Sequence, residues 1–124
     1  MNVLLDSDIL IEVLRMRDDA LLARWRELSV SDTLILYSPV SAAEVWTGAR
    51  PREHKAIEFC FNSLICAAMD YETGHLAGDL MRQYRKSHSL EIGDALIAAT
   101  AIRNQAQLWT RNRKHYPMPQ LRFF

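Results

Sequence analysis

Short apolar runs alternate with longer amphipathic stretches along this chain, and the alternation predicts strands and helices in turn. Val3 to Leu5 is a continuous apolar run, too short for a helix and typical of a strand that is buried on both faces. Leu34 to Tyr37 is a second such run, which ends at Ser38-Pro39. Three further segments are strand candidates: Cys66 to Met69, Leu108 to Thr110 and Leu121 to Phe124.

Apolar residues at helical spacing occupy most of the chain between these runs. The first helix is expected from Ile9, with Leu10, Val13 and Leu14 on the same face. The other expected helices run from about Asp19 to Leu28, from Ser41 to near Gly48, from Arg52 to Cys66, from Tyr71 to Ser87, and onward from Asp94. Strands that alternate with helices predict an α/β domain with a mostly parallel sheet.

Composition and charge narrow the class of protein. The chain has 124 residues, is 49% hydrophobic and has no net charge, which predicts a single domain over 1–124 and excludes a globally basic nucleic-acid binder. Residues 82–124, however, hold eight Lys and Arg against two acids, which suits an anionic partner. The N-terminal apolar stretch follows no basic run and is interrupted by Asp6 and Asp8, so we expect a cytoplasmic protein with no membrane partner.

Polar residues stand where the predicted strands end or where helices begin. Asp6 follows the first strand, Glu44 lies in the first turn of the helix after the second, Asp94 begins a helix, and Asn112 follows Leu108 to Thr110. In parallel sheets, sites form beyond the carboxyl ends of the strands. We therefore expect these side chains at one edge of the sheet.

Each acid also has an ordinary structural interpretation. Asp6 suits a helix cap, although Asp8 is the better cap by position. Ser41-Ala-Ala-Glu44 matches a capping box, and Asp94 suits the positive end of its helix. Taken together, several carboxylates at one edge repel each other unless a cation compensates them. Carboxylate oxygens without Cys or His suit Mg²⁺ or Mn²⁺, which can activate water against a phosphodiester.

Four segments, LLDSDILIEVL, SAAEVWTGAR, EIGDALIAATA and LWTRNRKHYP, resemble in order and spacing the motif blocks of PIN-domain ribonucleases of the VapC toxin type. The resemblance covers nearly the whole chain. It implies a three-layer α/β/α sandwich, Mg²⁺- or Mn²⁺-dependent cleavage of single-stranded RNA by metal-activated water, inhibition by a VapB-like antitoxin, and a homodimer.

The resemblance also assigns residues to roles. Asp6, Glu44 and Asp94 match the catalytic acids, with Asp6 and Asp94 as direct metal ligands and Glu44 bound directly or through water. Asn112 stands where relatives carry Asp or Asn, and its weaker amide ligand leaves a second metal ion open. The candidate RNA contacts are Thr110, Arg111, Arg113 and Lys114.

Two other functions fit parts of the sequence. A haloacid-dehalogenase-like phosphotransferase would use Asp6 as nucleophile and Asp8 as acid, but Ile9-Leu10 follows where that family places Gly-Thr. A non-catalytic RNA- or protein-binding module would use the acids only as helix caps. A covalent phosphate on Asp6 would identify the first, and metal-independent RNA binding without cleavage the second.

Overall fold

A four-stranded parallel sheet forms the centre of the computed structural model, which describes residues 1–124. The strands are β1 (Asn2–Leu5), β2 (Leu34–Tyr37), β3 (Ile65–Cys66) and β4 (Ala106–Trp109), in the order β3-β2-β1-β4. Leu4 of β1 is paired with Leu36 of β2 on one side and with Leu108 of β4 on the other. The first strand in sequence is therefore central in the sheet.

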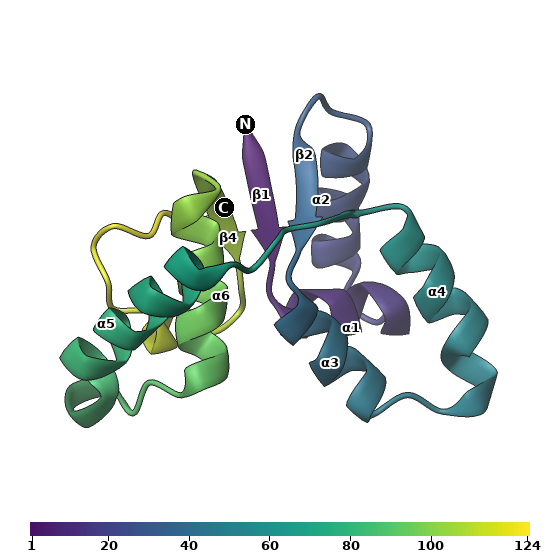
Figure 1. The fold of residues 1–124 in the computed structure, drawn as a ribbon. Coiled ribbons are helices and arrows are strands. Elements are labelled where there is room, and N and C mark those ends of the chain that lie inside the picture. The colour runs from purple at the N-terminus through teal and green to yellow at the C-terminus, as the bar shows by residue number, and fades with distance from the viewer.

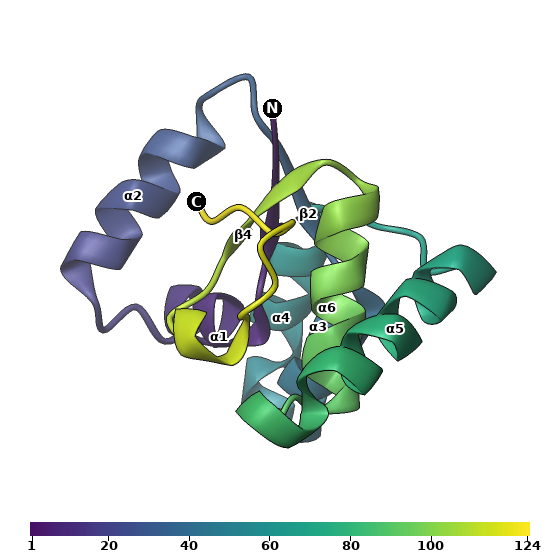
Figure 2. The ribbon, with the colours of Figure 1, turned by 90° about the vertical axis from the view of Figure 1, so that its left-hand side faces the viewer.

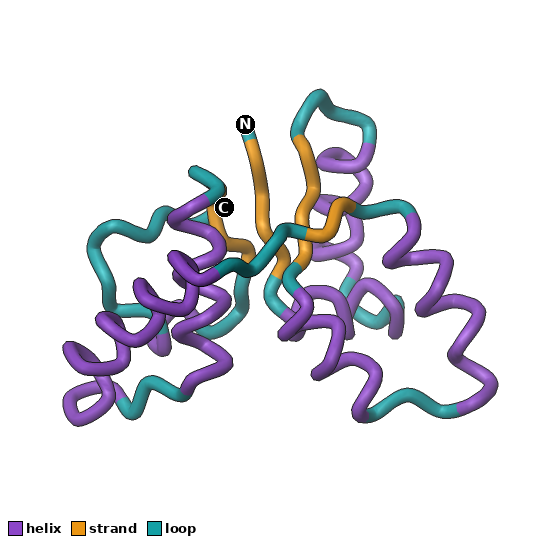
Figure 3. Tube along the Cα trace, in the orientation of Figure 1, coloured by secondary structure: helices purple, strands orange, loops and turns teal.

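Helices cover both faces of this sheet, so the predicted three-layer α/β/α sandwich is confirmed. Figure 1 shows α5 and α6 on one side of the strands and α1 to α4 on the other, and Figure 3 shows the strands between the two groups. No helix combines the length and apolar composition needed to cross a bilayer. The helices are α1 (Ser7–Arg15), α2 (Asp19–Ser29), α3 (Pro39–Thr47), α4 (His54–Asn62), α5 (Tyr71–His88) and α6 (Ile92–Arg103), with short 3-10 helices η1 (Pro51–Glu53) and η2 (Arg113–His115).

The side chains of the strands divide between two hydrophobic cores. Leu4 and Leu108 pack with α5 and α6, whereas Val3, Leu5 and Trp109 pack with α1 to α4. Successive residues of a strand point to opposite faces, and here both faces are covered. This is why the strands read as continuous apolar runs without polar alternation.

Helix α6 packs closely on the sheet because the residues it buries are small. Ala95, Ala98, Ala99 and Ala101 are fully buried in the core that includes Leu4 and Leu108. Small side chains let a helix backbone approach its neighbours closely. The close approach helps fix the first turn of α6, which carries Asp94, relative to the sheet.

Three predicted elements differ from the structure. The helix expected from Arg52 to Cys66 is shorter: η1 covers Pro51–Glu53, α4 covers His54–Asn62, and Cys66 belongs to β3. Leu121 to Phe124 is not a strand: it makes one isolated bridge beside β4, with Leu108 N–H donating to Arg122 O and Phe124 N–H to Leu108 O (Figure 2). Pro119, just before this segment, has no N–H to donate to a ladder. The strand expected at Cys66 to Met69 lies at Ile65–Cys66, because Asp70 caps α5.

Candidate active site

The carboxyl ends of the strands bring separate segments of the chain to one edge of the sheet. Asp6 follows β1 and Thr110 follows β4, and the Asp6 N–H donates to Trp109 O at 3.0 Å. The buried Ser41 hydroxyl of α3 donates to Leu5 O at 3.4 Å, which holds the start of α3 against the end of β1. The predicted convergence at this edge is confirmed for the backbone positions of these elements.

Asp6 is the N-cap of α1, so the prediction that Asp8 is the better cap is wrong. The helix begins at Ser7, and the Asp6 Oδ1 accepts the Ser7 N–H at 2.7 Å. Asp8 lies in the first turn instead. Asp6 is only 7% exposed and its other oxygen faces the site, which means that capping and a role in the site are compatible.

Glu44 has no capping role, because α3 begins earlier than the sequence pattern suggests. Ser38 is the N-cap, Pro39 occupies the first turn, and the Ser38 hydroxyl accepts the Ser41 N–H at 3.2 Å. Pro is favoured at this position, since its missing N–H would have no partner there. The capping box predicted for Ser41 and Glu44 is therefore wrong, and the exposed Glu44 carboxylate is free of the helix terminus.

Asp94 lies in the first turn of α6, as predicted, and faces the segment that follows β4. Its Oδ1 is 3.4 Å from the Tyr116 hydroxyl, and its Oδ2 is 3.8 Å from Nδ1 of His115. The Asp94 side chain is about a quarter exposed, at 27%. It is therefore accessible to solvent while being held beside the carboxylate at the end of β1.

Sequence reasoning missed Tyr116, which connects two of the predicted acids. Its hydroxyl donates to Asp6 Oδ2 at 2.8 Å and lies close to Asp94, and the side chain is only 3% exposed. A buried tyrosine needs a partner for its hydroxyl, but its position in a polar, proline-containing segment gave no signal of burial. Thr110, expected to contact RNA, instead donates to the same Asp6 oxygen at 2.9 Å and accepts the Asn112 N–H.

The electrostatics of the site reflect several negative charges close together. Burial raises the pKa of Glu44, and the negative charges of Asp6, Asp94 and Asp8 raise it further. Burial and the charge of Asp6 likewise raise the pKa of Asp94. No Lys or Arg side chain forms an ion pair with Asp6, Glu44 or Asp94. His115 lies 3.8 Å from Asp94 Oδ2, and even a protonated imidazole there leaves the three carboxylates with a net negative charge.

The carboxylate oxygens of Asp6, Glu44 and Asp94 are the kind of ligand that a hard divalent cation prefers. As the side chains stand, no three Asp, Glu, His or Cys residues come close enough to hold one ion. Mg²⁺, however, usually keeps several waters and is bound through one or two carboxylates. Asp6 and Asp94 are two such carboxylates, and they lie close to each other because both contact the Tyr116 hydroxyl.

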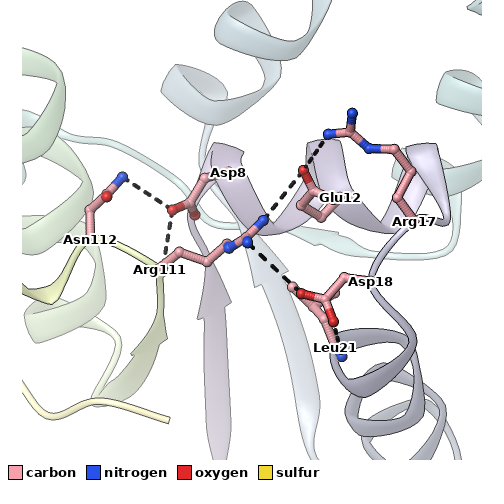
Figure 4. Close-up of polar contacts among 7 residues, drawn as sticks. All are labelled: Asp8, Glu12, Arg17, Asp18, Leu21, Arg111 and Asn112. Atoms are coloured by element: carbon pink, nitrogen blue, oxygen red, sulfur yellow. Dashed lines mark hydrogen bonds and ion pairs between the residues drawn. The ribbon is translucent and has the colours of Figure 1, made fainter.

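Asn112 lies beside Asp8 rather than among the three acids. Its Nδ2 donates to Asp8 Oδ2 at 3.3 Å, and the Arg111 N–H donates to the same oxygen at 2.9 Å (Figure 4). Asp8 thereby attaches the segment after β4 to the first turn of α1. The assignment of Asn112 as a catalytic residue stays a prediction, and the structure shows it in contact with Asp8.

Arg111, predicted to contact RNA, forms ion pairs within the protein, although its side chain is 49% exposed. Its guanidinium lies 3.3 Å from Glu12 Oε1 and 3.9 Å from Asp18 Oδ2, so it connects α1 with the N-cap of α2 (Figure 4). Arg17 pairs with the same Glu12 oxygen at 2.9 Å. Glu12 is almost fully buried, and a buried carboxylate needs such partners. The sequence does not reveal these partners because they lie on distant segments.

The remaining predicted RNA contacts differ in their surroundings. Arg113 donates to Phe124 O at 3.0 Å and lies over the Phe123 ring, 5.1 Å from its centroid, so its charge faces the C-terminal segment. Lys114 is exposed and has no ion pair. Residues 110–115, which follow β4, line a hollow of about 430 Å³. Lys114 is therefore the predicted cation that remains available to an anion.

Comparisons with known proteins agree with the fold. A PIN domain model matches residues 3–120. Ribonuclease VapC10 of Mycobacterium tuberculosis is 38% identical over 94% of this chain and 86% of its own length, and Ribonuclease VapC19 of the same species is 34% identical over 93% and 92%. The chain therefore belongs to the PIN-domain family and, within it, to the VapC proteins.

Solved structures show the same fold at lower sequence identity. VapBC2 from Rickettsia felis, bound to a DNA fragment from its promoter, superposes with a TM-score of 0.82 and 20% identity over 100% of this chain and 98% of its own. DNA-bound VapBC from Salmonella typhimurium gives 0.84 and 18%, over 100% and 97%. The comparisons do not favour the phosphotransferase or the non-catalytic alternative.

Proposed function

We propose that this protein is a Mg²⁺- or Mn²⁺-dependent endoribonuclease that acts as the toxin of a VapBC-type pair. The observation that carries the proposal is the convergence of Asp6, Glu44 and Asp94 without a Lys or Arg to compensate them. The names of the VapC10 and VapC19 relatives, both ribonucleases, support RNA as the substrate.

The side chains divide the work of the site. Asp6 and Asp94 would be the direct ligands of a bound divalent ion, and Glu44 would hold it directly or through water. A bound divalent ion supplies positive charge against the charge that develops on the phosphodiester and makes water more acidic. Thr110 and Tyr116 orient the Asp6 carboxylate through its Oδ2. A carboxylate with a raised pKa is a better proton acceptor near neutral pH, and this applies to Glu44.

In this proposal Glu44 would take a proton from the attacking water at one of its Oε atoms as the water oxygen bonds to phosphorus. The bond from phosphorus to the leaving ribose oxygen breaks, that oxygen takes a proton from solvent, and no covalent intermediate on the protein is needed. Lys114, exposed in the hollow after β4, binds a phosphate of the RNA. Phosphate contacts position a nucleic acid without reading its sequence. Sequence preference is left to other parts of the surface near the acids.

Cleavage of a labelled single-stranded RNA tests the proposal. The wild-type protein should cleave with Mg²⁺ or Mn²⁺ and stop when a chelator is added. Asp94→Asn should abolish cleavage while the thermal unfolding curve stays cooperative, since Asp94 is partly exposed and outside both cores. Asp32→Asn, an exposed carboxylate before β2, should cleave normally. Undiminished metal-dependent cleavage by Asp94→Asn would overturn the assignment.

A groove beside Glu44 suits the antitoxin partner of this proposal. It has a volume of about 340 Å³ and lies between α1, α3 and α4, with Glu44 on its wall. Its apolar lining suits the hydrophobic face of a helical segment, which is a common mode of peptide binding. An Arg of that segment would pair with the acids and compete with the metal. The apolar lining residues are Ile11, Leu14, Val45, Ala49, Ala56 and Ile57.

The structures of VapBC complexes that share this fold support a VapB-like partner, and a small protein encoded by a gene next to that of this chain is the candidate to test. Co-expression with that gene product tests the groove. Ala56→Trp adds bulk to the groove from an exposed position of α4, and it should prevent co-purification and relieve inhibition. Ala23→Trp, exposed on α2, is the matched control and should not. Equal co-purification of both variants would place the antitoxin elsewhere. The homodimer stays a prediction.

A further inference from the structure

Tyr116 joins the C-terminal segment to two carboxylates that come from distant parts of the chain. Its ring is buried against Phe123, with centroids 6.5 Å apart. Its hydroxyl is 2.8 Å from Asp6 Oδ2 and 3.4 Å from Asp94 Oδ1. A tyrosine hydroxyl has one proton, so it donates mainly to Asp6 and keeps Asp94 within reach of the same oxygen. One neutral group therefore lies against both acids.

The partners of Asp6 are all neutral donors. Ser7 N–H donates to Oδ1, and the Thr110 and Tyr116 hydroxyls donate to Oδ2. Such donors satisfy and orient a buried carboxylate, but they leave its negative charge in place. An Arg or Lys at the position of Tyr116 would hold the same two acids and also neutralise them. Because the Tyr116 hydroxyl is neutral, the negative charges of Asp6 and Asp94 still attract a cation.

We propose that Tyr116 is a positioning residue that holds Asp6 and Asp94 at a spacing that one divalent cation bridges. The inference rests on the proposed function, because it assumes that these two acids bind the ion. Tyr116 touches neither RNA nor the reacting phosphate in this assignment. The contact between the Tyr116 and Phe123 rings also helps to hold the C-terminal segment beside β4.

Direct binding of Mn²⁺ tests this inference without relying on activity. Mn²⁺ is titrated into the metal-free protein and the free ion is followed by electron paramagnetic resonance. Loss of a hydrogen-bond partner of a metal ligand typically weakens metal binding about 10–100-fold, and we expect a loss in that range for Tyr116→Phe. The control is Tyr84→Phe on α5, a half-buried tyrosine whose hydroxyl makes no hydrogen bond to the protein, and it should bind as the wild type does.

Cleavage kinetics separate positioning from general stability. For Tyr116→Phe, kcat at low Mn²⁺ should fall and recover as Mn²⁺ is raised, with KM for RNA unchanged. Thr110→Val removes the other donor to Asp6 Oδ2 but nothing from Asp94, so it should weaken Mn²⁺ binding less. An unchanged Mn²⁺ affinity in Tyr116→Phe overturns this inference. Absence of Mn²⁺ binding by the wild type overturns the proposed function, and this inference with it.

Discussion

Replacing Asp8 with Asn should stabilise the metal-free protein at neutral pH. Asp8 is partly buried, and its Oδ1 is a buried atom with no hydrogen-bond partner. Burial first, and then the negative charge of Asp6, raise the pKa of Asp8 from 3.8 to about 6, despite the hydrogen bond from the Arg111 backbone N–H. The ionised carboxylate is therefore costly in the folded state, and Asp8→Asn removes the charge while keeping one acceptor oxygen.

The sign and size of the effect follow from linkage. A carboxyl whose pKa is higher in the folded protein contributes stability below its unfolded pKa of 3.8, and this contribution is lost as the pH rises through about 6. The full difference between these values corresponds to about 3 kcal/mol. Asp8 is partly exposed, and screening by solvent reduces this to about 1–2 kcal/mol. The cost is present at neutral pH and absent near pH 4.

Urea unfolding in the presence of a chelator measures this difference. At about pH 7.5, Asp8→Asn should be about 1–2 kcal/mol more stable than the wild type, and at about pH 4 the two should be equal. Asp32→Asn, an exposed carboxylate, should change stability little at either pH. A loss of stability of the same size at both pH values would refute the reasoning, because it would show that the contacts to Arg111 and Asn112 outweigh the charge.

Three further predictions concern the core, the N-cap of α2 and the segment after β4. Leu108→Ala, at a fully buried position of β4, should cost about 2–5 kcal/mol in urea unfolding, and a loss below about 1 kcal/mol would contradict the packing described. Asp18→Ala removes the N-cap that accepts the Leu21 N–H at 3.0 Å, and it should lower stability by about 1 kcal/mol, measured as a lower Tm; an unchanged Tm would contradict it. Lys114→Gln should weaken RNA binding and reduce the slope of log affinity against log salt concentration by about one, measured by fluorescence anisotropy in the presence of a chelator. Arg111→Gln should leave both unchanged, because that guanidinium faces Glu12 and Asp18. The reverse ranking would restore Arg111 as an RNA contact.

The fold was largely predictable because the spacing of apolar residues and the order of strands and helices along the chain indicate it. The apolar runs at Val3 to Leu5 and Leu34 to Tyr37 are strands, and the small residues after Asp94 form a helix packed on the sheet. Errors fell where local pattern and tertiary context disagree. The Leu121 to Phe124 run is apolar because it covers β4 and Tyr116, and not because it extends the sheet.

The placement of the three acids at one edge of the sheet was predictable from the sequence. The residues that contact them were not. Asp6, Glu44 and Asp94 stand at sheet-edge positions that topology brings together. The partners of these acids depend on side-chain directions that no local pattern encodes. Tyr116 is 110 residues from Asp6 in sequence, and Arg111 pairs with acids on two different helices. A run of basic residues therefore suggested RNA contacts where two of the cations stabilise the protein itself.

A crystal structure of the wild-type protein grown with Mn²⁺ shows whether Asp6 and Asp94 bind one divalent ion. Anomalous scattering locates the ion independently of any assumed function. We expect one strong peak within ligand distance of both Asp6 and Asp94, with Glu44 bound directly or through water, and no such peak in Asp94→Asn. A peak at another place on the surface, or none beside Asp6, would contradict the account.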